Sequence, residues 1–141
     1  MATIEGLSRL FLDSSFLVAL YGTQDRMHHR ALELLEEADR AEARLCTIWD
    51  CIGESLTVLR RHFGHRASCA LADGLRHLTL VGYDTSHRLQ ALADFKRLSR
   101  GRRSVSFVDA LCAVVIRREL NGDPALSFDR DFRTLGLTVI A

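Results

Sequence analysis

The sequence predicts an α/β domain in which helices cover both faces of a mainly parallel sheet of about five strands, a three-layer α/β/α arrangement. Short apolar runs of strand length alternate along the chain with longer segments of helical periodicity, as in sheets whose parallel strands are connected by helices. The runs are nearly continuous in hydrophobicity, which indicates strands buried on both faces. The chain has 141 residues, 48% of them hydrophobic, which is enough for a genuine core.

Five apolar runs are predicted to form the strands. They are residues 9–12, 44–48, 78–82, 124–128 and 137–141. Six helices are expected between or beside them, at residues 14–21, 25–39, 50–63, 65–76, 85–98 and 106–119. One proline, nine glycines and no internal repeat leave no candidate linker, so residues 1–141 are expected to form a single domain.

Several helix starts carry capping residues. Asp50 is expected to cap the third helix, Thr85 or Ser86 the fifth, and Ser106 the sixth. The sixth helix begins within SFVDALCAVVI, residues 106–116, where apolar side chains cover every direction of the helical wheel. We therefore expect this helix to be buried all round.

Charge and cysteine content narrow the functional classes. The formal net charge of +1 argues against a protein that coats nucleic acid by bulk electrostatics, although a local basic patch could still follow a phosphate backbone. The four cysteines form no CxxC pair and no metal-finger spacing, and three of them lie in apolar surroundings, which predicts buried reduced thiols. No secretory signal and no apolar run of about 20 residues is found, so we expect a cytoplasmic protein without membrane contact.

Three aspartates lie where buried segments end or begin. Asp13 follows the apolar run 10–12, Asp129 follows the run 124–128, and Asp109 stands alone among the apolar residues of the sixth helix. A carboxylate taken out of water costs several kcal/mol unless it is neutralised, hydrogen-bonded or bound to a cation. Because the carboxyl ends of parallel strands and the helix starts that follow them meet at one edge, these aspartates predict a shared metal site.

Each aspartate also has an ordinary structural interpretation. Asp13, followed by two serines, is typical of a helix cap, Ser106 and Asp109 resemble a capping box, and Asp129 could be a turn residue. Asp131 is a further candidate ligand, or it hydrogen-bonds the turn that it occupies. The joint occurrence of the three favours the metal site, and a set of oxygen ligands suits Mg²⁺ or Mn²⁺ rather than zinc.

Glu54 is not selected by helical periodicity. It projects roughly opposite the apolar stripe of its helix, which is formed by Ile52, Leu56, Leu59 and Phe63. That position is expected of an ordinary solvated glutamate.

A cluster of carboxylates suits one kind of chemistry in particular. Two unit charges about 4 Å apart repel by roughly 4 kcal/mol at an effective dielectric constant of 20, so such a cluster favours bound cations. Divalent ions held by carboxylates can activate a water molecule and stabilise the leaving oxygen of a phosphodiester. Hydrolysis of nucleic acid is therefore the expected reaction.

The acidic motifs resemble those of PIN-domain ribonucleases. Asp13 in FLDSSFLVAL, Glu54 in IGESL, Asp109 in SFVDALCA and Asp129 in LSFDRDF are similar to that family's four acidic motifs in order and spacing, over nearly the whole chain. The resemblance is greatest to the VapC-type toxins of bacterial toxin–antitoxin pairs, in which these positions bind Mg²⁺ or Mn²⁺ and cut RNA. It implies a homodimer and a small VapB-like antitoxin that occludes the site, often with an inserted arginine.

The resemblance also assigns roles to individual residues. It implies that Glu54 is catalytic, and that Ser127 supports Asp129 or a water molecule beside the metal. The sequence FDRDF leaves the choice between Asp129 and Asp131 as ligand open. From their positions near the acidic motifs, contacts with RNA phosphates are predicted for four arginines, with a solvated charged surface as the alternative: Arg100, Arg102, Arg103 and Arg130.

Other functional classes remain as alternatives. One is a catalytically silent PIN-like module that binds protein, and another is a housekeeping RNA-processing nuclease. A third is a phosphoryl-transfer domain with Asp13 as nucleophile. It is disfavoured because no acid stands two residues after Asp13 and no lysine lies near a strand end.

Overall fold

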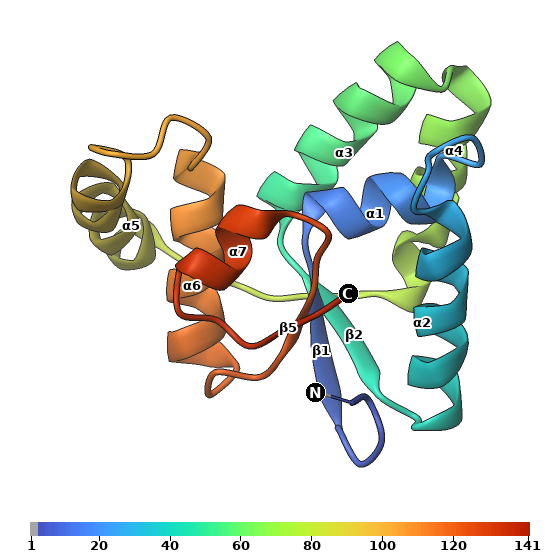
Figure 1. The fold of residues 1–141 in the computed structure, drawn as a ribbon, viewed down its shortest axis with the longest axis horizontal. Coiled ribbons are helices and arrows are strands. Elements are labelled where there is room, and N and C mark those ends of the chain that lie inside the picture. The colour runs from blue at the N-terminus through green and yellow to red at the C-terminus, as the bar shows by residue number, and fades with distance from the viewer. Residues whose placement is uncertain (1–2) are drawn as a thin grey trace.

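The computed structural model describes residues 3–141 and contains a five-stranded, entirely parallel sheet (Figure 1). The strand order across the sheet is β3-β2-β1-β4-β5. The strands are β1 (Arg9–Leu12), β2 (Arg44–Thr47), β3 (Thr79–Leu80), β4 (Ala125–Leu126) and β5 (Val139–Ile140). This confirms the predicted α/β class with its parallel sheet.

Helices pack on both sides of the sheet, with α1 to α4 on one side and α5 and α6 on the other (Figure 1). They are α1 (Ser14–Tyr21), α2 (His28–Arg40), α3 (Trp49–His62), α4 (His65–Gly74), α5 (Thr85–Leu98), α6 (Phe107–Glu119) and α7 (Arg130–Thr134). The first six match the predicted helices to within three residues at either end, whereas α7 was not predicted. No helix within residues 3–141 combines the length and the apolar character needed to cross a membrane.

The central strand β1 forms the middle of the core. Its residues Leu10, Phe11 and Leu12 are fully buried, and it pairs with β2 on one side and β4 on the other. The three strands β3, β4 and β5 have only two residues each, shorter than the apolar runs that predicted them. A run of apolar residues indicates burial, whereas a strand also requires a neighbouring strand to which it is hydrogen-bonded. The last residues of these three runs lie beyond the paired part of the sheet.

Helix starts agree with the predicted caps in part. Ser106 caps α6 as predicted, and Ala110–Ile116 of that helix are all buried. The prediction for Asp50 was wrong, because Ile48 occupies the cap position of α3 without a side-chain bond and Asp50 lies in the first turn. The prediction for α5 was also wrong, since Asp84 and not either of the next two residues caps that helix.

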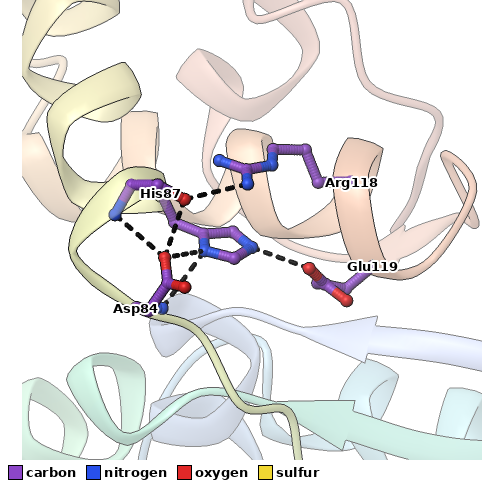
Figure 2. Close-up of polar contacts among 5 residues, drawn as sticks. Asp84, His87, Arg118 and Glu119 are labelled. Atoms are coloured by element: carbon purple, nitrogen blue, oxygen red, sulfur yellow. Dashed lines mark hydrogen bonds and ion pairs between the residues drawn. The ribbon is translucent and has the colours of Figure 1, made fainter.

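A polar cluster joins α5 to the end of α6 (Figure 2). His87 of α5 is buried, with its Nδ1 3.0 Å from Asp84 Oδ1 and its Nε2 2.7 Å from Glu119 Oε1. Arg118 Nη2 donates a hydrogen bond of 2.9 Å to Ser86 Oγ. The C-terminal end of α6 is therefore fixed against α5, which limits how far the whole helix can move.

The cysteines are free thiols, and three of the four are buried as predicted. Cys46, Cys51 and Cys112 are buried, and Cys69 is exposed on α4. The sulfur atoms of Cys51 and Cys112 lie 3.3 Å apart, between α3 and α6. Burial raises the pKa of the Cys112 thiol well above its ordinary value, so this group stays protonated at neutral pH.

Candidate active site

An acidic pocket of about 330 Å³ opens where β1 and β4 end. Asp13, Glu54, Asp109 and Asp129 all line it. They come from the residue after β1, the second turn of α3, the first turn of α6, and the loop between β4 and α7. Ligands bind at this edge of parallel sheets because side chains from several strands converge there, and the four acids do so in this chain.

Asp13 forms the buried floor of the pocket. The residue is only 4% exposed. Its Oδ1 accepts hydrogen bonds from Phe16 N at 3.0 Å and Ser15 Oγ at 2.7 Å, and its Oδ2 accepts one from Ser127 Oγ at 2.6 Å. Burial raises the pKa of Asp13 to about 6, against the lowering effect of these bonds. The interpretation of Asp13 as the cap of α1 is therefore also correct.

Ser127 connects two segments that are far apart in the chain. Besides donating to Asp13, its Oγ accepts a bond of 3.1 Å from Asp129 N. Ser15 Oγ accepts a bond of 2.9 Å from Phe128 N and lies 3.4 Å from Ser127 Oγ. The start of α1 and the loop after β4 are thus held together by two hydroxyl groups, and Ser127 contacts both Asp13 and the backbone of Asp129.

Replacing Ser127 by alanine is expected to lower the free energy of unfolding by about 1–3 kcal/mol. The buried Oδ2 of Asp13 would lose its hydrogen-bond donor, and the N–H of Asp129 would lose its acceptor. The measurement is urea unfolding followed by circular dichroism. The matched control is Ser104→Ala, at an exposed serine, which should change stability by less than about 0.5 kcal/mol. Equal midpoints for the two variants would contradict the role given to Ser127.

Asp109, Asp129 and Asp131 form the tightest group of acids. One carboxylate oxygen from each can be chosen so that all lie within 4.8 Å of one another, and within residues 3–141 no other three potential ligands come so close. Burial raises the pKa of Asp109 to about 6, and the negative charges of Asp129 and Glu54 contribute. Both aspartates of FDRDF therefore lie beside Asp109, and Asp129 is the one of the two that also lines the pocket.

Three helices begin at this pocket. Asp13 caps α1, Ser106 and Asp109 form the capping box of α6, and Asp129 Oδ1 accepts a bond of 2.9 Å from Asp131 N at the start of α7. The interpretations of Asp13 as a helix cap and of Ser106 and Asp109 as a capping box are confirmed, whereas Asp129 caps a short helix instead of occupying a turn. Helix N-termini favour negative charge, which helps the chain to gather these carboxylates. The raised pKa values of Asp13 and Asp109 show that repulsion and burial are not fully offset, so a hard cation with oxygen ligands fits the site.

Comparison with known proteins identifies the family. Residues 10–136 match the PIN domain. The chain belongs to the PIN-domain family. It is 31% identical, over 132 residues, to the 23S rRNA-specific endonuclease VapC20 from two strains of Mycobacterium tuberculosis, a match that covers 93% of this chain and 97% of each relative. It is also similar to the crystal structure of M. tuberculosis VapC20, a toxin that cleaves the sarcin–ricin loop, with a TM-score of 0.79, 31% identity, and coverage of 92% of this chain and 96% of that chain.

This similarity confirms the resemblance to VapC-type PIN domains that the acidic motifs indicated. The family match, residues 10–136, covers β1 to β4, the six predicted helices and all the acidic motifs, and it ends before β5. PIN domains are generally metal-dependent, in agreement with the acidic cluster.

Glu54 stands at the rim of this PIN-domain pocket. Glu54 is exposed, as the helical wheel predicted. It nevertheless lines the pocket together with Cys51 and Val58, which lie three and four positions away on the same helix. Partial loss of hydration raises the pKa of Glu54, and the charge of Asp129 adds to the effect. The solvated face and the pocket face of α3 are thus the same face, which a helical wheel alone cannot show.

None of the four arginines predicted to contact RNA lines the pocket. They are exposed, three on the loop between α5 and α6 and one at the start of α7: Arg100, Arg102, Arg103 and Arg130. The cation that does line the pocket is Arg26, on the loop between α1 and α2, and the sequence prediction missed it. Nothing in the local sequence GTQDRM shows that this loop returns to the pocket, because its path depends on how α1 and α2 pack.

Proposed function

We propose that this protein is a metal-dependent endoribonuclease and the toxin of a VapBC-type toxin–antitoxin pair. The observation that carries the proposal is the acidic pocket, which brings Asp13, Glu54, Asp109 and Asp129 together in a PIN-domain chain. Its similarity to an rRNA endonuclease over 93% of the chain supports RNA as the substrate. On this proposal residues 1–141 act as one nuclease domain, in the cytoplasm.

We propose that Asp109, Asp129 and Asp131 hold Mg²⁺ or Mn²⁺, because their oxygen atoms already lie within 4.8 Å of one another. A divalent cation bound there supplies positive charge to a phosphodiester and to the oxygen that leaves it. Asp13 lies below this group and, through Ser127, fixes the backbone of Asp129. Glu54 is the exposed acid at the rim, where its carboxylate can accept a proton from a water molecule that enters from solvent.

The partners proposed are those of VapC-type toxins. A VapB-like antitoxin would cover the acidic pocket, and the toxin would form a homodimer. The sarcin–ricin loop, which the similar toxin VapC20 cleaves, is the first substrate to test, because the similarity extends over nearly the whole of both chains.

The test is cleavage of RNA by the purified, antitoxin-free protein. Cleavage is expected with Mg²⁺ or Mn²⁺ and should stop when EDTA is added. Metal binding has its own readout, since a ligand that binds only the folded state raises the melting temperature by mass action. Metal-induced stabilisation without cleavage of any RNA would favour the silent protein-binding module, and cleavage without growth arrest on expression would favour a housekeeping nuclease.

A further inference from the structure

Arg26 is the one lysine or arginine in the wall of the acidic pocket, among the residues that the structure describes. It lies on the loop between α1 and α2, with Asp25 and Met27 beside it in the same wall. The other charged side chains that line the pocket, Asp25 included, are carboxylates. A single cation therefore faces a site that is otherwise negative.

The loop that carries Arg26 is tied to the end of α1. Asp25 N donates to Gly22 O at 2.8 Å, Met27 N donates to Asp25 Oδ1 at 2.8 Å, and His28 N donates to Asp25 O at 3.0 Å. The ring of His28 donates through Nδ1 to Ala19 O at 2.8 Å. Since α1 also carries the Asp13 cap at its other end, the backbone of Arg26 is held at a fixed position relative to the pocket.

The guanidinium of Arg26 is available to a ligand. It forms no hydrogen bond or ion pair within residues 3–141, and its residue is exposed, whereas Arg9 and Arg30 are paired with carboxylates. Within the described residues, no carboxylate of the pocket forms an ion pair with Arg26, so its charge is free to meet an anionic ligand.

We infer that Arg26 binds a backbone phosphate of the RNA beside the bond that is cut, an inference that rests on the proposed ribonuclease function. A polyanion that enters a pocket of carboxylates is repelled, except where a cation meets it. Arginine suits this task because its planar guanidinium can donate two parallel hydrogen bonds to one phosphate. The anchored loop places this donor in the pocket wall, so Arg26 sets where the RNA backbone lies relative to Asp109 and Asp129.

The test compares Arg26→Ala with Arg66→Ala. Arg66 is exposed on α4, has no bonded partner within the described residues and does not line the pocket, so its variant carries the same change of charge. Arg26→Ala is expected to lower kcat/KM for RNA by about ten- to a hundredfold, since a charge-assisted bond is lost. Arg26→Lys should recover part of the loss, and Arg66→Ala should behave as wild type.

A second measurement separates phosphate binding from a structural role. RNA affinity is measured by fluorescence anisotropy at several salt concentrations, in the Asp109→Asn background so that the RNA is not cut. Losing one phosphate contact should weaken RNA binding and reduce the slope of log K against log salt by about one. The affinity for Mg²⁺, measured by calorimetry on the Arg26→Ala protein, should stay the same.

Three outcomes would overturn the inference. Arg26→Ala could match Arg66→Ala in both kcat/KM and salt slope. It could cut faster than wild type, which would make Arg26 an internal block of the pocket. It could change Mg²⁺ affinity while RNA affinity stays the same, which would make it a charge that tunes the carboxylates. If wild type cuts no RNA, the proposed function fails, and the anisotropy measurement still decides whether Arg26 binds RNA.

Discussion

Asp109→Asn is expected to lower the rate of RNA cleavage at least about a hundredfold while leaving the fold intact. Asn keeps a side-chain oxygen that can accept from Ser106 N, so the capping box of α6 survives. The change removes one negative charge from the group of Asp109, Asp129 and Asp131, where the cation is proposed to bind. Single-turnover cleavage of a labelled RNA at saturating Mg²⁺ is the measurement.

The control for this variant is Asp73→Asn, at an exposed carboxylate on α4 that does not line the pocket. It should cut RNA as wild type does. The rise in melting temperature caused by Mg²⁺ should shrink in Asp109→Asn and remain in the control. Equal cleavage by wild type and Asp109→Asn would show that a contaminating nuclease is responsible, and the assignment of this pocket would fail.

Asp13→Asn is expected to stabilise the metal-free protein at pH 7.5 while it impairs cleavage. The pKa of Asp13 is about 6 in the fold against an ordinary 3.8, so the fold disfavours its charge. That difference corresponds to at most about 3 kcal/mol, and we expect a gain of about 1–3 kcal/mol in the free energy of unfolding. An amide retains the oxygen that Phe16 N needs, and Ser127 Oγ can accept from the new NH₂ group.

The difference in stability between Asp13→Asn and wild type is expected to depend on pH. Between pH 4 and pH 6 the folded protein binds more protons at Asp13 than the unfolded chain does, so wild type becomes more stable as the pH falls through this window. The advantage of Asp13→Asn should therefore be full above pH 6 and vanish near pH 4. Urea unfolding in EDTA at pH 7.5, 6 and 4.5 measures it. A variant that is less stable than wild type at pH 7.5 would show that the bonds to the carboxylate outweigh the cost of burying its charge.

Much of the fold could be predicted from local patterns in the sequence. Continuous apolar runs located β1 and β2, and helical periodicity located α1 to α6, because burial on one or two faces fixes which residues must be apolar. Asp13, Asp109 and Asp129 were found for the same reason. A carboxylate beside a buried segment contradicts the expected pattern, and the contradiction marks a site.

The remainder depends on contacts that no local pattern contains. The five residues of α7 are too few to show periodicity, and the helix begins at the Asp129 cap in the loop after β4. Glu54 and Arg26 face the pocket only because α3 and the loop before α2 lie beside α1 in space. Whether a charged residue faces open solvent or a shared pocket depends on residues that are distant in the sequence. The helical wheel therefore showed that Glu54 is exposed but not that it lines a pocket, and the sequence around Arg26 did not indicate its position.

The bond between Ser127 and Asp13 spans 114 positions, and this separation has a consequence for when activity begins. The ribosome synthesises the chain from its N-terminal end, so Asp13, Glu54 and Asp109 are added before β4 and α7. Until those late segments dock beside β1, the pocket lacks Asp129, Asp109 lacks its neighbour Asp131, and Asp13 lacks the hydrogen bond from Ser127. The nuclease therefore becomes competent only after β4 and α7 have been synthesised and have packed beside β1.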